Sequence, residues 1–157
     1  MDADACRDLV QRYYGELWNE WRLELIDELL APDLHFRGSL GTVLDGRDDF
    51  RGYLLGIRQA LPDFHHDLEW VVAEEGEDGS GGAAAARIVY SGTHEGDLFG
   101  VPGTGHRINY QGAAFFQMAS RNGSSQGGSG SPAVITEIWT LGDMSAVRRQ
   151  LLGTATS

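Results

Sequence analysis

The sequence predicts an α+β fold, and three observations support this. Up to Leu61, apolar residues recur in steps of three or four, as they do in amphipathic helices. From Phe64 onward the pattern changes to alternation, over segments rich in Ile, Val, Tyr, Phe and Trp. Helices followed by an antiparallel sheet are typical of α+β proteins. Because the sheet must curl round the helices to bury both, we expect a cavity at its mouth that suits a small molecule.

Three helices are predicted in the first part of the chain. The first runs from Asp4 to Leu17, and a short second helix around Leu25–Leu30 ends at Ala31-Pro32. A short strand over Leu34–Arg37 follows. The third helix begins at a capping Asp48 or Asp49 and is stopped by Pro62.

Four longer strands are predicted after the third helix, over residues 64–73, 86–95, 106–119 and 133–141. In the first of these, alternation places His66 on one face with Phe64, Leu68, Trp70 and Val72. The glycine-rich stretches near 74–86 and 121–132 are expected to be flexible hairpin loops inside one domain spanning residues 1–157.

The pairing of the last two strands decides which side chains face the cavity. If Gln117 lies opposite Glu137, one face pairs Ala114 with Thr140, Phe116 with Ile138 and Met118 with Thr136. The other face then pairs Phe115 with Trp139. We expect the first face to point inward. A slip by one residue would turn Glu137 and Asp143 inward instead, so this alternative stays open.

Composition excludes several classes of function. The chain carries a formal net charge of −11 with no lysine, and residues 1–80 hold 19 acids against 7 arginines. An acidic surface repels phosphate backbones and anionic lipid, so we expect neither a nucleic acid nor a membrane as partner. The single Cys6 cannot form an internal disulfide, and no apolar run reaches membrane-spanning length. A cytoplasmic location is the expectation.

Four stretches together resemble one known family. They are LVQRYYGELWNE with IDELLAPD, ALPDF, SGTHEGDLFGVPGTGHRI, and ITEIWTLGD followed by RRQLLG. Their order and spacing over residues 9–153 resemble the SnoaL-like polyketide cyclases, also called ester cyclases, of the NTF2-like or steroid-isomerase-like superfamily. The resemblance implies a cone-shaped α+β barrel, with N-terminal helices packed into a strongly curved, mainly antiparallel sheet. It also implies a homodimer formed through the sheet. Relatives include cyclases, isomerases, epoxide hydrolases, dehydratases, cofactor-free oxygenases and proteins without known activity.

The catalytic residues that the resemblance would supply are absent from this chain. Cyclases of the family use an inward aspartate on the last strand and a histidine opposite it. The corresponding positions here are Thr140 and Ala114, neither of which titrates near neutral pH. The steroid-isomerase base near Gly38 is absent too. Only the first-helix tyrosine, an enolate hydrogen-bond donor in that branch, has a counterpart, which is Tyr13.

Other residues are therefore candidates for catalysis. His94 shares an inward face with Tyr90 and suits proton transfer near neutral pH, or it holds the adjoining loop. Tyr13 is a hydrogen-bond donor to a substrate carbonyl. His66 is a weaker candidate, because a lone histidine on an apolar face is more often a core residue. Glu137 is a candidate base only if the register slips.

An aromatic wall is predicted for a flat, unsaturated ligand, although aromatic residues also simply fill small barrels. The expected substrate-binding residues are Trp18, Phe36, Tyr53, Tyr90, Tyr110, Ala114, Phe116, Ile138 and Thr140. No metal site and no cofactor are expected, because the histidines lack metal-binding spacing.

The leading hypothesis is a cofactor-independent cyclase or isomerase acting on a small, apolar, carbonyl-bearing metabolite resembling a polyketide. The alternatives are a small-molecule-binding protein without catalysis, and a hydrolase or cofactor-free oxygenase on the same fold. We also expect a homodimer through the face that carries Phe115 and Trp139, since exposed aromatic residues on a sheet often mark an interface.

Overall fold

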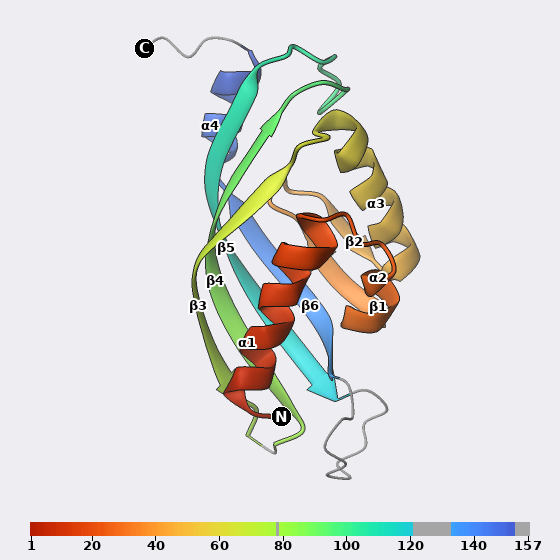
Figure 1. The fold of residues 1–157 in the computed structure, drawn as a ribbon, viewed down its shortest axis with the longest axis vertical. Helices are drawn as coiled ribbons and strands as arrows, with labels where there is room; N and C mark the ends of the chain where they lie inside the picture. The colour runs from red at the N-terminus through yellow and green to blue at the C-terminus, as the bar shows by residue number, and fades with distance from the viewer. Residues whose placement is uncertain (78, 121–132, 153–157) are drawn as a thin grey trace.

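The computed structural model describes residues 1–77, 79–120 and 133–152. Six strands form one sheet in the order β2-β1-β6-β5-β4-β3, in which β1 and β6 run parallel and all other neighbours are antiparallel. The strands are β1 (Leu30–Arg37), β2 (Val43–Asp45), β3 (His65–Glu75), β4 (Gly81–Thr93), β5 (Arg107–Ser120) and β6 (Ala133–Gly142). The sheet is strongly curled and does not close on itself (Figure 1).

The first helices cover the concave side of this sheet and the last one packs against β5, which confirms the α+β prediction. Their bounds are α1 (Ala3–Arg12), the π-helical segment η1 (Tyr13–Trp18), α2 (Leu25–Leu29), α3 (Arg47–Ala60) and α4 (Met144–Leu151). Helix α1 packs against β3 and β4, whereas α3 lies over β1 and β2 at the other side of the curl (Figure 1). The hydrophobic core fills the space between these helices and the sheet.

The helices differ from the predicted ones in three details. The first helix changes to π-helical hydrogen bonding at Tyr13. Helix α3 starts directly after Gly46, whose φ is +89°, so the prediction that Asp48 or Asp49 caps it was wrong. Both aspartates lie in the first helical turn, where they favour the helix dipole without capping it. Helix α4 was not predicted, and its cap is Asp143, whose side chain accepts from the Ala146 backbone N–H.

Strands β3 and β4 extend further into residues 74–86 than the composition indicates, leaving only 76–80 as their connection. The reason is that the small residues of this stretch are packed beneath α1. Ala84 and Ala86 are buried, and a Cβ placed on Gly82 would lie 2.2 Å from the Cys6 sulfur. The other predicted loop, 121–132, lies outside the described residues.

A β-bulge corrects the predicted face of β3. The pairing between β3 and β4 shifts between Leu68 and Trp70. Such a shift turns every later side chain to the opposite face. Trp70 and Val72 are therefore exposed on the convex side, whereas Val71 packs against the core. Simple alternation missed this change.

The predicted register of β5 and β6 is confirmed as far as Gln117. Ala114 pairs with Thr140, Phe116 with Ile138, and Gln117 with Glu137. The slipped register is therefore wrong, and Glu137 lies exposed on the convex face. Beyond Gln117 a bulge pairs Met118 with Ile135, so the expected pairing with Thr136 was also wrong.

One row of paired residues crosses the convex face through all six strands. Its members are Val43, Arg37, Trp139, Phe115, Ala85 and Val72, which we call the convex row. Phe115 and Trp139 are 49% and 41% exposed, and their rings lie 5.9 Å apart. The convex row therefore presents apolar side chains to solvent.

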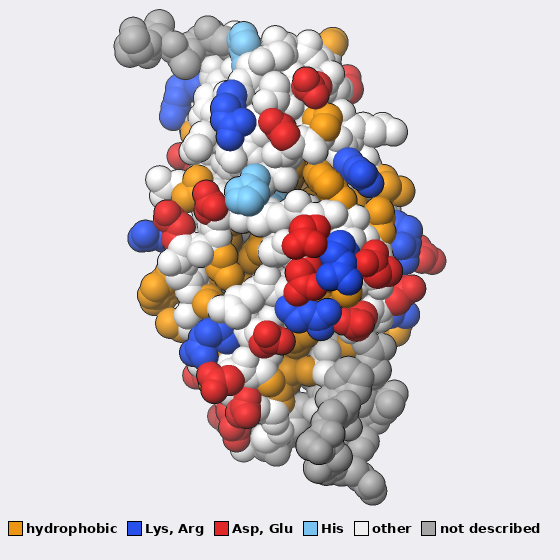
Figure 2. Space-filling model, viewed as in Figure 1, with side chains coloured by type: hydrophobic (Ala, Val, Ile, Leu, Met, Phe, Trp, Pro, Cys, Tyr) orange, Lys and Arg blue, Asp and Glu red, His pale blue; other side chains and the backbone are white. Residues whose placement is uncertain are grey.

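Charged side chains gather on the helical side instead. Figure 2 shows acidic and arginine side chains next to one another there. Arg12 pairs with Glu16 and Glu28, and Arg22 pairs with Glu16 and Glu24. Glu16, Glu24 and Glu28 of the acidic first half thus lie in a partly exposed cluster that arginines partly neutralise. No helix in the described parts of the chain is long and apolar enough to cross a membrane.

Candidate functional site

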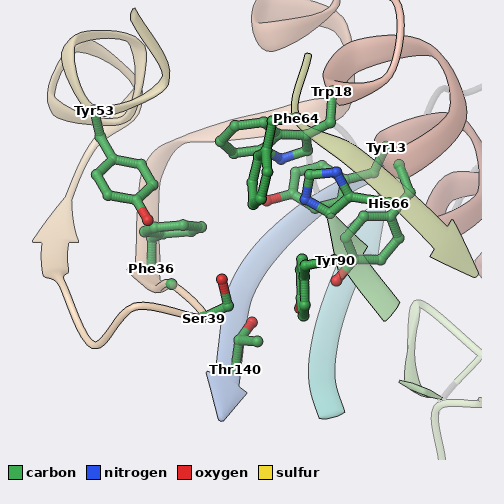
Figure 3. Close-up of a pocket in the computed structure, with 11 residues that line it drawn as sticks. Tyr13, Trp18, Phe36, Ser39, Tyr53, Phe64, His66, Tyr90 and Thr140 are labelled. Carbon is green, nitrogen blue, oxygen red and sulfur yellow. The ribbon is translucent and has the colours of Figure 1, made fainter. Parts of the chain in front are cut away.

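A small cavity lies between η1, α3 and the concave face of the sheet. Its volume is about 20 Å³, and Figure 3 shows the side chains that surround it. A space of this size accommodates about one water molecule. The lining residues are Tyr13, Tyr14, Trp18, Phe36, Gly38, Ser39, Tyr53, Phe64, His66, Tyr90 and Thr140. The cavity is therefore lined by aromatic rings, hydroxyl groups and one imidazole, and none of these residues carries a carboxylate.

The π-helical segment supplies three of the lining side chains. Hydrogen bonds from residue i+5 to residue i widen the helix, which brings residues five apart onto the same face. Tyr13 and Trp18 have this spacing, and both are buried beside Tyr14. Short π-helical segments occur often at functional sites, and nothing in the residue pattern predicted this one.

His66 is enclosed by aromatic side chains. Its ring centroid lies between 4.7 and 5.2 Å from those of Phe64, Tyr90, Trp18 and Tyr14. Its Nδ1 is buried and has no hydrogen-bond partner among the described residues. Burial, with a smaller contribution from neighbouring His65, lowers the pKa of His66 to about 3. The imidazole is therefore neutral at physiological pH and has an unsatisfied nitrogen in an apolar setting.

The backbone of His66 is held by the side chain of Asn19. The amide group of Asn19 donates to the His66 carbonyl at 2.9 Å, and its oxygen accepts from the His66 N–H at 2.8 Å. Because β3 is an edge strand, the amide of Asn19 takes the place of a neighbouring strand there. Asn19 thus fixes where His66 enters the cavity. Sequence reasoning missed it, since the contact spans 47 positions and involves a residue just after a helix.

Hydroxyl groups surround the cavity in a connected cluster. The hydroxyls of Ser39 and Tyr110 lie 2.9 Å apart, and Tyr90 is hydrogen-bonded to Tyr14 and Ser39. Burial raises the pKa of Tyr13, Tyr14 and Tyr90 above its ordinary value. These phenols therefore keep their protons and act as hydrogen-bond donors rather than as bases.

The hydroxyl of Tyr13 is a hydrogen-bond donor without an acceptor within this cluster. The indole of Trp18 hydrogen-bonds to the Tyr13 oxygen, which opposes the rise in its pKa. An indole N–H only donates. The Tyr13 O–H therefore stays available, because it donates no hydrogen bond to any other described residue.

The sequence of this chain matches the model of a known protein family. A family model described as SnoaL-like polyketide cyclase matches residues 8–123. The chain belongs to the SnoaL-like polyketide cyclase family. A comparison with curated proteins returned no match.

Solved structures share the fold of this SnoaL-like chain. TsrD from Streptomyces laurentii is 20% identical, with a TM-score of 0.71, over 96% of this chain and 97% of that one. IdmH from Streptomyces antibioticus is 27% identical, with a TM-score of 0.66, over 92% of this chain and 96% of that one. A SnoaL-like polyketide cyclase from Agrobacterium tumefaciens is 19% identical, with a TM-score of 0.62, over 91% of this chain and 97% of that one.

In this SnoaL-like chain, His94 lies outside the cavity lining. Its Nε2 is 3.1 Å from the Val101 carbonyl, which only accepts, so Nε2 carries the proton. Its Nδ1 then accepts from the Thr104 hydroxyl at 2.9 Å and from the Thr104 N–H at 3.3 Å. His94 is 0% exposed, and both ring nitrogens hold the loop that follows β4. This geometry favours the loop-holding role over proton transfer.

The predicted aromatic wall is only partly assembled. Trp18, Phe36, Tyr53, Tyr90 and Thr140 line the cavity together with Tyr13 and His66. Tyr110, Ala114, Phe116 and Ile138 are buried behind it and are not among its lining residues. Four lining residues were not among the predicted site residues, namely Tyr14, Gly38, Ser39 and Phe64. Alternation already placed Phe64 beside His66, so that signal was present in the sequence.

The described residues contain no group of three His, Cys, Asp or Glu side chains placed to hold a metal ion. The cavity lining itself supplies an imidazole and several phenols. A neutral imidazole accepts a proton, and buried phenols stabilise a developing oxyanion.

Proposed function

We propose that this SnoaL-like protein is a cofactor-independent enzyme of the cyclase or isomerase type. Its substrate is a small, apolar, carbonyl-bearing metabolite resembling a polyketide. The observation that carries the proposal is the buried Nδ1 of His66, which has no partner in the described chain and belongs to a side chain that lines a cavity together with hydroxyl groups. Leaving a buried polar atom unpaired costs about 1–3 kcal/mol, so such an atom suggests an interaction made only with a ligand.

In this mechanism His66 replaces the His94 of the sequence hypothesis as the proton acceptor. Nδ1 takes a proton from the carbon next to the substrate carbonyl, while the Tyr13 hydroxyl donates a hydrogen bond to the enolate oxygen. Burial makes the free imidazole a weak base. The negative charge of the enolate restores its basicity, because an opposite charge nearby favours imidazolium. The same proton then returns to the product.

Deuterium exchange tests this proposal and does not require the natural substrate. A panel of aryl alkyl ketones is incubated in deuterated buffer, and deuterium uptake next to the carbonyl is followed by mass spectrometry. A positioned general base contributes about 10²–10⁴-fold, so His66→Gln should lose at least about 10²-fold of the exchange rate. Tyr13→Phe should lose less, because it removes only one donor.

The matched control is His94→Asn, which changes a buried histidine outside the cavity lining. Its exchange rate per folded molecule should equal that of the wild type. Equal rates for His66→Gln and the wild type would refute His66 as the base, and loss only in His94→Asn would restore the original hypothesis.

A second candidate function is ligand binding without catalysis. Two observations favour it: Ala114 and Thr140 stand where the resemblance places the acid–base pair, and the cavity is only about 20 Å³. Aromatic polyketides that bind tightly, with no exchange and no product in the mass spectrum, would support this candidate over the enzyme.

We also propose that two copies associate through the convex row. Its exposed aromatic pair lies between Arg37 and Ala85, and exposed Val43 and Val72 lie at its two ends. Its one charged side chain, Arg37, is stacked over Trp139 at 5.5 Å. Few charges thus oppose the approach of a second copy there. Light scattering after size exclusion should give twice the chain mass for the wild type and the chain mass for Trp139→Asp. A wild-type monomer would refute the homodimer.

A further inference from the structure

The entrance of the cavity can be located from the exposure of its walls. Of the eleven lining residues, ten are buried, and only Tyr53 on α3 is partly exposed. Figure 3 shows Tyr53 and Phe36 together at one side of the cavity, opposite Tyr13, His66 and Tyr90. Among the lining residues, Tyr53 is thus the one that contacts both the cavity and solvent.

Tyr53 is held by packing alone. Its ring lies 5.2 Å from that of Phe36 and 6.4 Å from that of Trp18. Its hydroxyl covers Gly38, where an added Cβ would lie only 2.8 Å from the tyrosine oxygen. Within the described chain this hydroxyl has no hydrogen-bond partner. Moving Tyr53 away from Gly38 therefore breaks ring contacts but no hydrogen bond.

Helix α3 is weakened on both sides of Tyr53. Gly52 precedes it and Gly56 follows one turn later, and a Cβ at either position would meet nothing within 4 Å. Packing therefore does not require glycine there. A glycine inside a helix costs about 0.5–1 kcal/mol relative to alanine, because it loses more backbone freedom on folding. These two glycines lower the cost of distorting the turn that carries Tyr53.

We propose that the turn of α3 carrying Tyr53 is the gate of the cavity. When Tyr53 moves away from Gly38, a flat unsaturated ring enters between α3 and the β1–β2 turn and replaces the tyrosine ring against Phe36 and Trp18. The closed gate accounts for a cavity far smaller than the roughly 300–1,000 Å³ of ordinary ligand sites. The role of this ring as substrate rests on the proposed function, whereas the gate itself does not.

Chemical labelling of His66 measures the opening directly. The probe is diethyl pyrocarbonate, whose carbonyl carbon is attacked by an unprotonated imidazole nitrogen; an N–C bond forms, a C–O bond breaks, and ethanol and CO₂ leave. Labelling of each histidine in the full chain is followed by peptide mass spectrometry. Because apparent reactivity scales with the population of the open state, Tyr53→Ala should speed the labelling of His66 by about tenfold or more. Tyr53→Phe keeps the ring and should keep the protection.

The same spectra contain internal standards. His35, His65 and His106 are exposed and report the reagent, whereas His94 is buried in its loop and reports unfolding. Leu55→Ala is the matched control, since Leu55 is an exposed residue of α3 outside the cavity lining and its change should leave His66 labelling unaltered. An equal rate for His66 in Tyr53→Ala and the wild type overturns the gate, as does wild-type labelling of His66 as fast as that of His65.

A second variant keeps the test decisive if Tyr53→Ala unfolds and exposes His94. Replacing Gly52 and Gly56 by alanine stiffens α3, so labelling of His66 should slow by about threefold or more. An unchanged rate in this double variant overturns the proposal. Labelling needs no turnover, so a protein that labels as expected but exchanges no deuterium refutes the proposed enzyme and leaves the gate intact.

Discussion

Two buried histidines of this chain have opposite surroundings. His94 is 0% exposed and His66 is 5% exposed, so burial does not distinguish them. The ring nitrogens of His94 are hydrogen-bonded to Val101 and Thr104. The ring of His66 is surrounded by aromatic side chains, and its Nδ1 has no partner in the described chain. The hydrogen bonds of a buried histidine, rather than its burial, separate a structural role from a reactive one.

The largest expected effect comes from removing each histidine in turn. His94→Ala leaves the Val101 carbonyl and Thr104 without their partner, which should cost about 2–4 kcal/mol in the free energy of unfolding. His66→Phe removes an unpaired nitrogen and keeps a ring in the aromatic surroundings, so at pH 7 it should change stability by less than about 1 kcal/mol. Urea denaturation measures both values.

The assigned roles of the two histidines are wrong if His66→Phe loses more stability than His94→Ala. A large loss in His66→Phe with none in His94→Ala would mean that His66 is the structural histidine. His94→Asn, which keeps polar groups near the loop, should recover part of the loss and so separates missing hydrogen bonds from a missing ring.

The second prediction concerns how the stability of the folded protein changes at acid pH. The pKa of His66 is about 3 in the folded protein and takes its ordinary value of 6.5 when unfolded. The unfolded state therefore binds the proton first, and stability falls as the pH drops from about 6.5 toward 3, by up to about 1.4 kcal/mol per pH unit. His66→Phe lacks this contribution. Its stability should fall less steeply than that of the wild type between pH 6 and 4, as measured by urea denaturation at each pH.

Carboxylates also titrate in this range, but they are present in both proteins and cancel in the difference. Parallel curves for the wild type and His66→Phe would show that His66 is solvated or paired in the folded state, and the contrast with His94 would disappear.

Sequence alone could predict the fold because local patterns control it. Pro62 marked the end of α3, alternation gave the four long strands, and the pairing of Gln117 with Glu137 gave the face of β6; β2 was not predicted, and Ala31-Pro32 lies inside β1. The bulge at Leu68–Trp70 escaped prediction because one extra residue in a strand has no distinct local pattern. The π-helical turn escaped for the same reason.

The site was harder to predict than the fold, because its key contacts are far apart in sequence. Alternation placed both histidines inward, but it could not show that Thr104 and Val101 return to His94. Nor could it show that Asn19 reaches His66 across 47 positions. The preference for His94 in the sequence hypothesis followed from this, since a periodic pattern reports the direction of a side chain and not its hydrogen bonds.

A third prediction examines how firmly His66 is positioned. Asn19→Ala removes both bonds to the His66 backbone, one as donor and one as acceptor, and should cost about 1–3 kcal/mol by urea denaturation. Labelling of His66 should rise because its backbone is no longer held. Labelling of His94 should stay unchanged, because Asn19 does not contact the loop around His94. Asn19→Asp keeps the acceptor but turns a carboxylate oxygen toward the His66 carbonyl oxygen, which repels it, so this variant should also lose stability. Unaltered stability in Asn19→Ala would show that the edge of β3 is held by the sheet alone.

The smallest expected effect comes from making His94 resemble His66. Thr104→Val keeps the shape of the side chain and removes its hydroxyl, one of the groups that Nδ1 of His94 contacts, while the Thr104 backbone N–H remains at 3.3 Å. The loss should be about 0.5–2 kcal/mol, because besides the bond to His94 the variant loses the solvent-exposed bond that the Thr104 hydroxyl accepts from the His106 N–H at 3.2 Å. Thr104→Ser keeps the hydroxyl and is the control. Labelling of His94 should increase in the valine variant alone, because only there does its nitrogen lose a partner. If His94 is labelled equally in both variants, the hydrogen bond from the Thr104 backbone N–H is enough to protect Nδ1 of His94. That backbone hydrogen bond, rather than the hydroxyl, would then distinguish His94 from His66.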